Sequence, residues 1–170
     1  MLSRLISKAK EFSKEAHQGK TRKGDGSPYF GHLHGVYMIA RSVSDDPVVL
    51  ASCYLHDTIE DTWVVYEDLL REFGKEIADV VLAVSEDKSI KDWHSRKARY
   101  LETVFSNEKA VLVAWADKIH NTRSLTKVKD FKVFNASLKD KIAFYQKFAD
   151  LLPDGKMKFR LNSLLTKYTM

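Results

Sequence analysis

The sequence predicts an all-α fold, and two observations carry that prediction. Apolar residues recur at helical spacing through most of the chain, and no stretch alternates apolar and polar residues between hairpin turns as β-strands would. Residues that break helices are few. The chain has three prolines and seven glycines, and four of those glycines fall between Gly19 and Gly31. We therefore expect a bundle of helices with one clear loop at 19–31.

Helical periodicity defines the expected elements in chain order. They are residues 6–17, 66–73, 77–84, 98–105 and 142–152. The first ends at His17, before the turn at 18–20. Further apolar stretches occupy residues 36–40, 48–55 and 110–116, and the stretch at 48–55 is typical of a buried helix. With 170 residues, no internal repeat and no long linker, residues 1–170 are expected to form a single domain.

Cysteine content and hydropathy predict a cytoplasmic location. Cys53 is the one cysteine, it lies inside an apolar run, and it fits a reducing compartment. No leader with a basic start and an apolar centre is present, and no apolar stretch reaches the roughly eighteen residues that span a bilayer. The sequence thus predicts no membrane partner, and it carries no signal for a particular oligomeric state.

A formal net charge of +5 raises the alternative of nucleic-acid binding. Basic residues are densest toward the C-terminus, at Lys127, Lys129, Lys132, Lys139, Lys141, Lys147, Lys156, Lys158 and Arg160. They alternate with apolar positions, as on the solvated face of amphipathic helices, and no helix-turn-helix pattern or stacking surface accompanies them. A small, highly anionic ligand explains the excess charge equally well. We therefore expect no nucleic-acid partner.

The first polar cluster follows the apolar run at 48–55. His56 and Asp57 are adjacent, and in a continuous helix Glu60 and Asp61 return to the same side one turn later. Imidazole and carboxylate groups at the edge of a core are costly unless a cation or another partner compensates them. For this cluster alone, a helix end that carries solvated acids is the alternative interpretation.

A second polar cluster favours a metal site over solvated acids. Asp117 follows the apolar run at 110–116, with Asn121 one helical turn later, and His32 lies upstream, just before the apolar stretch at 36–40. The resulting candidate metal ligands are His32, His56, Asp57 and Asp117. Nitrogen and oxygen ligands without thiolates favour a hard or borderline divalent ion with open positions for water, such as manganese, over a closed structural zinc site.

Four sequence blocks occur in an order that resembles a known family. They are Arg22-Lys23 with Pro28-Tyr29 and His32, then residues 55–62, then Phe73-Gly74, then residues 116–123. This pattern is similar to the HD-domain hydrolases of the RelA/SpoT group, and within that group to the small stand-alone alarmone hydrolases related to Mesh1. The resemblance runs in order from about residue 17 to about residue 150. Four ordered blocks are far more specific than a lone His-Asp pair.

The resemblance implies a single HD-domain helical bundle that uses manganese to hydrolyse the 3′-pyrophosphate of guanosine tetra- and pentaphosphate. In that family the metal ligands match His32, His56, Asp57 and Asp117. The positions of Glu60 and Asp61 match the acidic pair that handles the attacking water. The implied partner is therefore a small-molecule nucleotide.

Residues expected to contact that nucleotide also follow from the resemblance. Arg22, Lys23 and Asn121 match nucleotide contacts, while Lys97, Lys141 and Tyr145 match positions near the phosphates and ribose. Simpler interpretations exist for both sets. A solvated turn would account for Arg22 and Lys23. A basic helix surface with a core tyrosine would account for Lys141 and Tyr145.

The chain departs from the family pattern at one position and carries a competing histidine close by. The family usually has His-Pro where this chain has His32-Leu33, which removes a rigid turn but no ligand. His34 competes with His32 for the ligand role, and the family spacing from Tyr29 selects His32.

The remaining histidines are expected to have ordinary roles. His17 ends the first helix and His94 lies in a charged region. His120 has two interpretations, as a group that supports the metal ligands or as a buried histidine with satisfied hydrogen bonds.

Two other functions are compatible with the same motifs. One keeps the metal chemistry but changes the substrate to another phosphorylated nucleotide, such as an adenosine analogue of the alarmone or NADPH. The other is a protein that binds nucleotide without cleaving it. Intact Glu60 and Asp61 argue against the non-catalytic alternative, since degenerate sensors can lose such groups.

Overall fold

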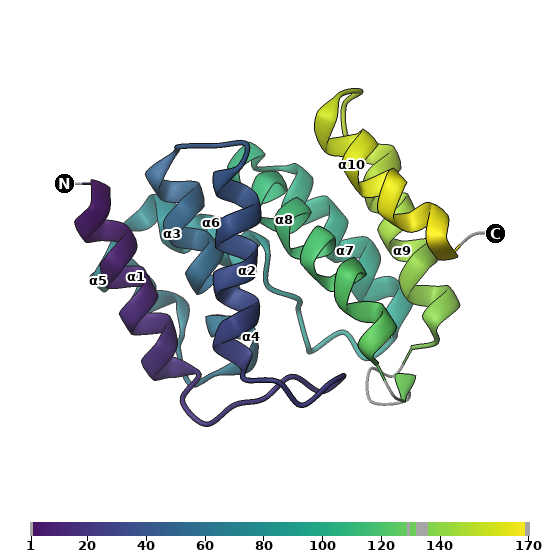
Figure 1. Ribbon diagram of the computed structural model, residues 1–170. Coiled ribbons are helices and arrows are strands. Elements are labelled where there is room, and N and C mark those ends of the chain that lie inside the picture. The colour runs from purple at the N-terminus through teal and green to yellow at the C-terminus, as the bar shows by residue number, and fades with distance from the viewer. Residues whose placement is uncertain (1, 129, 132–135, 169–170) are drawn as a thin grey trace.

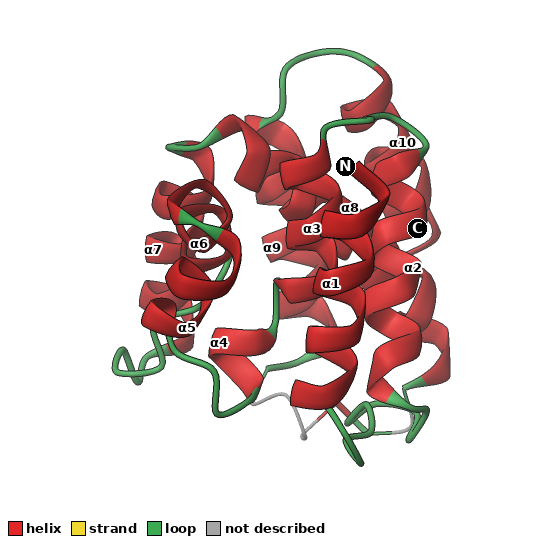
Figure 2. Ribbon diagram, turned by 90° about the vertical axis from the view of Figure 1, so that its left-hand side faces the viewer, coloured by secondary structure: helices red, strands yellow, loops and turns green. Residues whose placement is uncertain are grey.

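The computed structural model describes residues 2–128, 130–131 and 136–168, and within these ranges the fold is all-α, as predicted. The helices are α1 (Leu2–Ala16), α2 (Tyr29–Arg41), α3 (Pro47–Leu55), α4 (Thr58–Asp61), α5 (Tyr66–Phe73), α6 (Lys75–Ala83), α7 (Trp93–Phe105), α8 (Glu108–Ser124), η1 (Leu125–Lys127), α9 (Leu138–Leu151), α10 (Lys156–Leu165) and η3 (Thr166–Tyr168). Among these residues an isolated bridge between Thr21 and Pro28 is the sole extended pairing, and Figure 2 shows helices and loops alone.

Side-chain caps explain why several helices begin earlier than apolar periodicity predicts. Asp92 accepts a hydrogen bond from the backbone N–H of Ser95 at 2.7 Å, and α7 therefore starts at residue 93 rather than 98. Ser137 caps α9 in the same way, through the N–H of Asp140 at 3.1 Å, so that this helix starts at 138 rather than 142. Apolar periodicity detects the buried face of a helix. It does not detect a first turn that consists of polar residues.

The expected loop at 19–31 begins and ends a few residues earlier than predicted. Helix α2 begins at Tyr29, directly after Pro28, and Gly31 lies inside its first turn. A glycine within a helix costs some conformational entropy but does not prevent the helix, so Gly31 gave a false signal. The loop therefore occupies residues 17–28, between α1 and α2.

Helices α3 and α8 lie at the centre of the helical packing (Figure 1). Helix α3 contacts α1, α2, α6 and α8, and every residue from Val49 to Leu55 is buried. Because other helices cover α3 on every side, its sequence is apolar all round. Helix α8 contacts α2, α3, α6, α7 and α10. The first polar cluster of the sequence follows the end of α3, and the second, Asp117 with Asn121, lies in the C-terminal half of α8.

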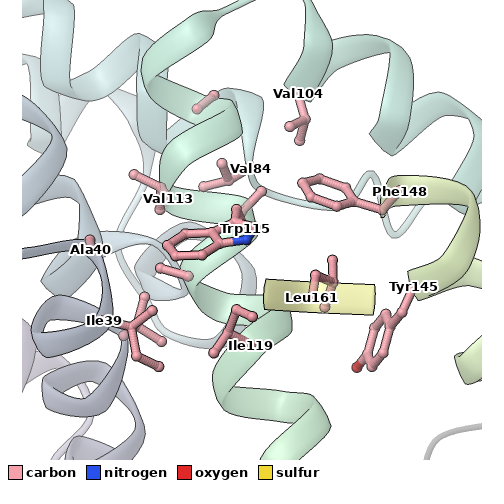
Figure 3. Close-up of a cluster of buried hydrophobic side chains, with 14 of the residues drawn as sticks. Ile39, Ala40, Val84, Val104, Val113, Trp115, Ile119, Tyr145, Phe148 and Leu161 are labelled. Carbon is pink, nitrogen blue, oxygen red and sulfur yellow. The ribbon is translucent and has the colours of Figure 1, made fainter. Parts of the chain in front are cut away.

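The larger hydrophobic core fixes helix α8 against its neighbours. Figure 3 shows Trp115 of α8 among side chains of α2, α9 and α10. Its ring is fully buried, and its indole N–H donates to the backbone oxygen of Met157 at 2.9 Å. Burial of so large a side chain with a satisfied N–H anchors the helix firmly. Asp117, two residues later, is thereby held at the edge of this core.

Among the described residues, no helix is both long enough and apolar enough to cross a membrane. The basic C-terminal residues are largely exposed, as expected for a solvated face, with Lys127, Lys139, Lys147 and Lys156 in this group. Lys129 and Lys132 lie outside the described residues. Lys141 differs, because it faces a cavity.

Candidate metal centre and the adjoining cavity

A break between α3 and α4 places the first pair of candidate ligands. Helix α3 ends at Leu55, and the hydroxyl of Thr58 donates to the Leu55 carbonyl at 2.6 Å as α4 begins. At this break the Nδ1–H of His56 donates to the carbonyl of Cys53 at 2.9 Å. The other ring nitrogen, Nε2, faces Asp57 Oδ2 at 3.0 Å, and in the neutral form of the ring it would offer its lone pair to a metal ion.

The continuous helix assumed for the first cluster is therefore wrong. Because α3 stops before His56, Glu60 and Asp61 belong to the separate short helix α4, in which the N–H of Asp61 donates to the carbonyl of Asp57 one turn earlier at 2.9 Å. Both acids nevertheless line the same cavity as His56 and Asp57. The break re-aims α4 so that its carboxylates reach partners in the loop 85–92.

The four candidate ligands converge from helices α2 and α8 and from the α3–α4 break. His32 Nε2 lies 3.4 Å from Asp57 Oδ2, 3.2 Å from Asp117 Oδ1 and 3.3 Å from His56 Nε2. His56 Nε2 and Asp117 Oδ1 are 3.8 Å apart. Donor atoms of His32, His56 and Asp57 all lie within 4.8 Å of one another. The structure thus brings together residues that are up to 85 positions apart, as predicted from their types.

This donor set fits a divalent cation. His32 and His56 are buried, and the side chains of Asp57 and Asp117 are only 17% and 12% exposed. Buried carboxylates require a positive charge among them, which a metal ion or a protonated imidazole can supply. Burial opposes the charged form of His56, but Asp57 and Asp117 outweigh it and raise the pKa of this imidazole well above its ordinary value. This His/Asp cluster could therefore hold a divalent metal ion.

Electrostatics within the cluster point the same way. Burial opposes ionisation of Asp57, but the imidazoles of His56 and His32 outweigh it and hold the pKa of this carboxyl well below its usual range. For Asp117, burial is likewise outweighed, here by the ammonium of Lys118 and both imidazoles, and its pKa is also well below normal. Both carboxyl groups are therefore anionic ligand candidates at neutral pH.

Neighbours on α8 orient the Asp117 carboxylate. Its Oδ1 accepts a hydrogen bond from Asn121 Nδ2 at 2.6 Å, and its Oδ2 accepts one from Lys118 Nζ at 2.8 Å. The same ammonium also donates to the hydroxyl of Tyr100 at 3.1 Å. No role for Lys118 was predicted from the sequence. A lysine inside an otherwise buried run was the available signal, because buried ammonium groups need anionic partners.

Tyr29 is a second residue that sequence reasoning left without a role. Its hydroxyl lies 2.7 Å from Asp57 Oδ2 and 2.9 Å from Asp61 Oδ2. Burial and these two carboxylates raise the pKa of Tyr29, so that the phenol remains a proton donor. Its spacing of three residues before His32 on α2 was the signal, since such positions share a helix face.

His34 lies apart from the cluster. It is exposed, and its Nδ1 makes a 2.8 Å hydrogen bond with the hydroxyl of Tyr54. On a helix, two residues only two positions apart point in different directions. The geometry therefore favours His32 over His34 at the candidate centre. His17, which stacks on Tyr29 at 4.9 Å, and His94 of α7 are also absent from the cavity lining.

The carboxylate of Glu60 has an unusual environment. Its Oε2 accepts a hydrogen bond from the backbone N–H of Glu86 at 3.1 Å. Burial, together with the negative charges of Asp57 and Glu86, raises the pKa of Glu60 to about 7. Such a group exchanges protons readily near neutral pH.

Asp61 is held differently, through Lys88. The ammonium of Lys88 donates to Asp61 Oδ1 at 3.0 Å and to the backbone carbonyl of Glu60 at 2.6 Å. Neither Glu86 nor Lys88 was predicted. They lie in the irregular segment 85–92, where no periodicity marks a residue as facing a site.

One cavity of about 620 Å³ adjoins the cluster. All of the site residues predicted from the sequence line it, namely Arg22, Lys23, His32, His56, Asp57, Glu60, Asp61, Lys97, Asp117, Asn121, Lys141 and Tyr145. His120 does not line the cavity, although its ring packs beside His32 at a centroid distance of 4.8 Å. A volume of this size accommodates a nucleotide-sized ligand.

Lysines gather on the α7, α8 and α9 side of the cavity. Lys97 forms an ion pair with Glu86 and lies over the ring of Phe144 at 4.8 Å. Burial and the positive charges of Lys97 and Lys118 lower the pKa of Lys141 to about 8. A cavity in which ammonium groups destabilise one another favours an anionic ligand, because added negative charge relieves that repulsion.

The loop 17–28 reaches the end of α8 (Figure 1), where Arg22 of this loop contacts Asn121. The backbone N–H of Arg22 donates to Ser27 O at 2.8 Å, and Gly26, with φ of 73°, allows the tight turn between them. Arg22 Nη2 then donates to Asn121 Oδ1 at 2.8 Å. Asn121 thus bridges Arg22 and the candidate ligand Asp117.

Comparison with known proteins places the chain in a family. The model of the HD domain matches residues 9–153. Over 124 residues the chain is 33% identical to the MESH1 guanosine-3′,5′-bis(diphosphate) 3′-pyrophosphohydrolase of Xenopus tropicalis, which covers 71% of this chain and 69% of that protein. It is 32% identical over 119 residues to the bifunctional (p)ppGpp synthase/hydrolase SpoT of Escherichia coli, covering 66% of this chain but 17% of SpoT.

Solved structures share the fold. A metazoan ortholog of SpoT that hydrolyses ppGpp superposes with a TM-score of 0.82 at 23% identity, over 96% of this chain and 95% of that one. A protein from Listeria monocytogenes superposes with a TM-score of 0.73 at 27% identity, over 86% and 98% of the two chains. Since the family match spans 9–153 and encloses the whole histidine–aspartate cluster, the chain belongs to the HD-domain family and is similar to the RelA/SpoT-type alarmone hydrolases.

Proposed function

We propose that this protein hydrolyses the 3′-pyrophosphate of guanosine tetra- and pentaphosphate and releases pyrophosphate, leaving GDP or GTP. One observation carries the proposal. A single cavity contains both a donor set suited to a divalent metal and a group of mutually repelling lysines. A nucleotide with phosphate groups at both ends of its ribose matches this distribution. Similarity to proteins named for that reaction supports the choice of substrate.

Manganese is the proposed metal, held by His32, His56, Asp57 and Asp117. Two imidazole and two carboxylate ligands suit this ion and leave coordination positions open. When bound, a divalent cation acidifies water and neutralises charge that develops on phosphoryl oxygens. Tyr29 and Asn121 support this set by orienting the carboxylates of Asp57 and Asp117.

Glu60 is the proposed general base. Its pKa of about 7 allows it to accept the proton of the attacking water at neutral pH. Asp61 is proposed to orient that water, because Lys88 and the hydroxyl of Tyr29 fix its two carboxylate oxygens. This buried, readily protonated Glu60 favours catalysis over a role in nucleotide binding alone.

The nucleotide is proposed to bind along the remaining wall of the cavity. Arg22 presents a flat guanidinium suited to stacking on a base, with Lys23 beside it and Asn121 as its hydrogen-bond partner. On the other wall, Lys97, Lys141 and Tyr145 would contact the phosphates and ribose. All six residues line the cavity.

The proposal also includes one HD-type domain over residues 1–170 and a cytoplasmic location. The family match over residues 9–153 supports the domain assignment. Cys53 is buried and forms no disulfide, and burial raises the pKa of its thiol, so it behaves as an inert core residue in a reducing compartment.

The cleaved bond tests the proposed function. Purified protein with manganese and guanosine tetraphosphate is expected to yield GDP and intact pyrophosphate, because the cavity holds the nucleoside while the metal and Glu60 address the 3′ substituent. Product analysis by anion-exchange chromatography measures this directly.

Other products would contradict the pose. Stepwise release of orthophosphate, or loss of the 5′ phosphates, would mean that the substrate binds in another orientation. If guanosine tetraphosphate survives while NADPH or an adenosine analogue loses its ribose phosphate group, the metal assignment stands and the substrate changes.

Arg22→Ala is expected to weaken substrate binding more than chemistry. The variant loses a guanidinium at the cavity wall but no metal ligand, so the Michaelis constant should rise by roughly tenfold or more with a smaller change in kcat. Arg99→Ala is the matched control, since Arg99 is 61% exposed, pairs with Glu102 and does not line the cavity. An unchanged Michaelis constant for Arg22→Ala would return Arg22 to the role of a solvated loop residue.

A further inference from the structure

The ring of His120 lies between two residues of the candidate site without facing the cavity itself. Its Nδ1 is 2.9 Å from Nδ1 of His32 and 3.4 Å from Nη1 of Arg22. The pair of rings meets at an interplanar angle of 65°. No role for His120 follows from the cavity lining, because this residue does not belong to it.

Proton positions on the two rings follow from the geometry of the cluster. His32 Nε2 faces Asp57 Oδ2, Asp117 Oδ1 and His56 Nε2 within 3.4 Å. For Nε2 to offer its lone pair to a metal, the proton of a neutral His32 must sit on Nδ1. That Nδ1–H then donates to Nδ1 of His120, which must be the acceptor and carry its own proton on Nε2.

The Arg22 contact is consistent with this assignment. A guanidinium has donors only, so the Nδ1 atom that it approaches at 3.4 Å must be an acceptor. Both neighbours of His120 thus require a lone pair on the same atom. The shorter contact belongs to His32.

The packing of α8 against α2 holds the His120 ring in place. A Cβ atom added to Gly35 would lie 2.3 Å from Cδ2 and 2.4 Å from Nε2 of His120. The ring therefore rests against the backbone of α2, at a position that only glycine leaves open. Gly31, one turn earlier on the same helix, has no atom within 4 Å of an added Cβ. The close approach is specific to position 35.

We propose that His120 is a positioning residue that holds His32 as a metal ligand by accepting its Nδ1–H, and that Gly35 exists to admit the His120 ring. The inference rests on the proposed metal-dependent function and adds a role to a residue outside the cavity. Asn121, the next residue on α8, performs the equivalent task for Asp117 through its 2.6 Å hydrogen bond. Consecutive residues of one helix therefore orient two ligands from two different helices.

Loss of this acceptor should reduce metal affinity rather than fold stability alone. Removing a group that orients a metal-bound histidine typically lowers affinity by roughly ten- to a hundredfold. The His32 ring loses its fixed tautomer and orientation, whereas the ligand nitrogen itself remains. A histidine that merely fills space in the core would change the melting temperature and leave metal affinity untouched.

The test is titration of the metal-stripped full chain with manganese, monitored by the electron paramagnetic resonance signal of the free ion, in the absence of nucleotide. His120→Leu keeps much of the volume but removes the acceptor, and its dissociation constant is expected to rise by roughly ten- to a hundredfold. His120→Asn places an amide oxygen near the position of Nδ1, and it is expected to recover most of the affinity.

Gly35→Ala provides an independent variant with an unchanged His120. The added methyl group must displace the ring from His32, so its dissociation constant should rise in the same direction as that of His120→Leu. Gly31→Ala is the matched control on the same helix, and it is expected to bind manganese like the wild type. Should His120→Leu fail to fold, by circular dichroism, the two glycine variants decide the question.

Three outcomes are distinguishable. Wild-type affinity in both His120→Leu and Gly35→Ala would overturn the inference even if guanosine tetraphosphate is cleaved as proposed. Equal loss of affinity in His120→Leu and His120→Asn would also overturn it, because the acceptor would then be irrelevant. Loss in His120→Leu with recovery in His120→Asn supports it, whatever nucleotide proves to be the substrate, because no nucleotide is present in the titration.

Discussion

His32→Ala is expected to abolish tight binding of one manganese ion and to lower turnover by at least about a hundredfold. His32 Nε2 lies within 3.4 Å of donor atoms from all three other candidate ligands, and its loss opens the centre of the cluster. The buried carboxylates of Asp57 and Asp117 would remain charged, but the metal ion would have one neutral ligand fewer. Metal content by atomic absorption and activity with saturating manganese measure both effects.

His34→Ala is the matched control for this variant. It removes an imidazole two residues away on the same helix, whose Nδ1 contacts the hydroxyl of Tyr54 instead. Metal content and turnover should stay close to those of the wild type. A chelator should likewise abolish activity in the wild type, and manganese should restore it. Full activity in stripped protein, or equal metal loss from the two alanine variants, would refute the assignment.

Glu60→Gln combined with Asp61→Asn is expected to lower turnover by roughly a hundredfold or more while manganese and nucleotide still bind. The amides keep the shape of the side chains and remove both bases. Metal titration and single-turnover kinetics separate binding from chemistry. The conservative change Glu67→Gln, at an exposed position of α5, controls for the loss of surface charge. Near-normal turnover in the double variant would remove this acidic pair from the mechanism.

The pH profile then identifies which acid accepts the proton. Burial and the neighbouring charges of Asp57 and Glu86 raise the pKa of Glu60 to about 7. A general base works in its deprotonated form. The wild-type rate should therefore increase as the pH rises through the neutral range, and it should be low at acidic pH, where Glu60 is protonated. Asp61→Asn alone should retain this inflection, and Glu60→Gln alone should lose it. An inflection that persists in Glu60→Gln would assign the proton to another group.

Local sequence signals determined the fold class and much of the element order. Helix α5 begins and ends at the predicted residues, 66 and 73, because its apolar face and the glycine at 74 lie within one short segment. The types of the candidate ligands were readable for a similar reason. An imidazole or carboxylate group at the end of an apolar run stands out from its immediate sequence neighbours. The order and spacing of the family motifs then favoured His32 over His34 as the ligand.

Tertiary structure alone decided which groups support those ligands. Tyr29 meets Asp57 and Asp61 across two helices, and His120 of α8 meets His32 of α2, contacts between residues that are 28 to 88 positions apart. The break between α3 and α4, which turns Glu60 toward the loop 85–92, was equally hidden. Sequence periodicity records which face of an element is apolar. The partner that a polar side chain meets depends on how separate helices pack, and that is set by the whole core rather than by any local run of residues.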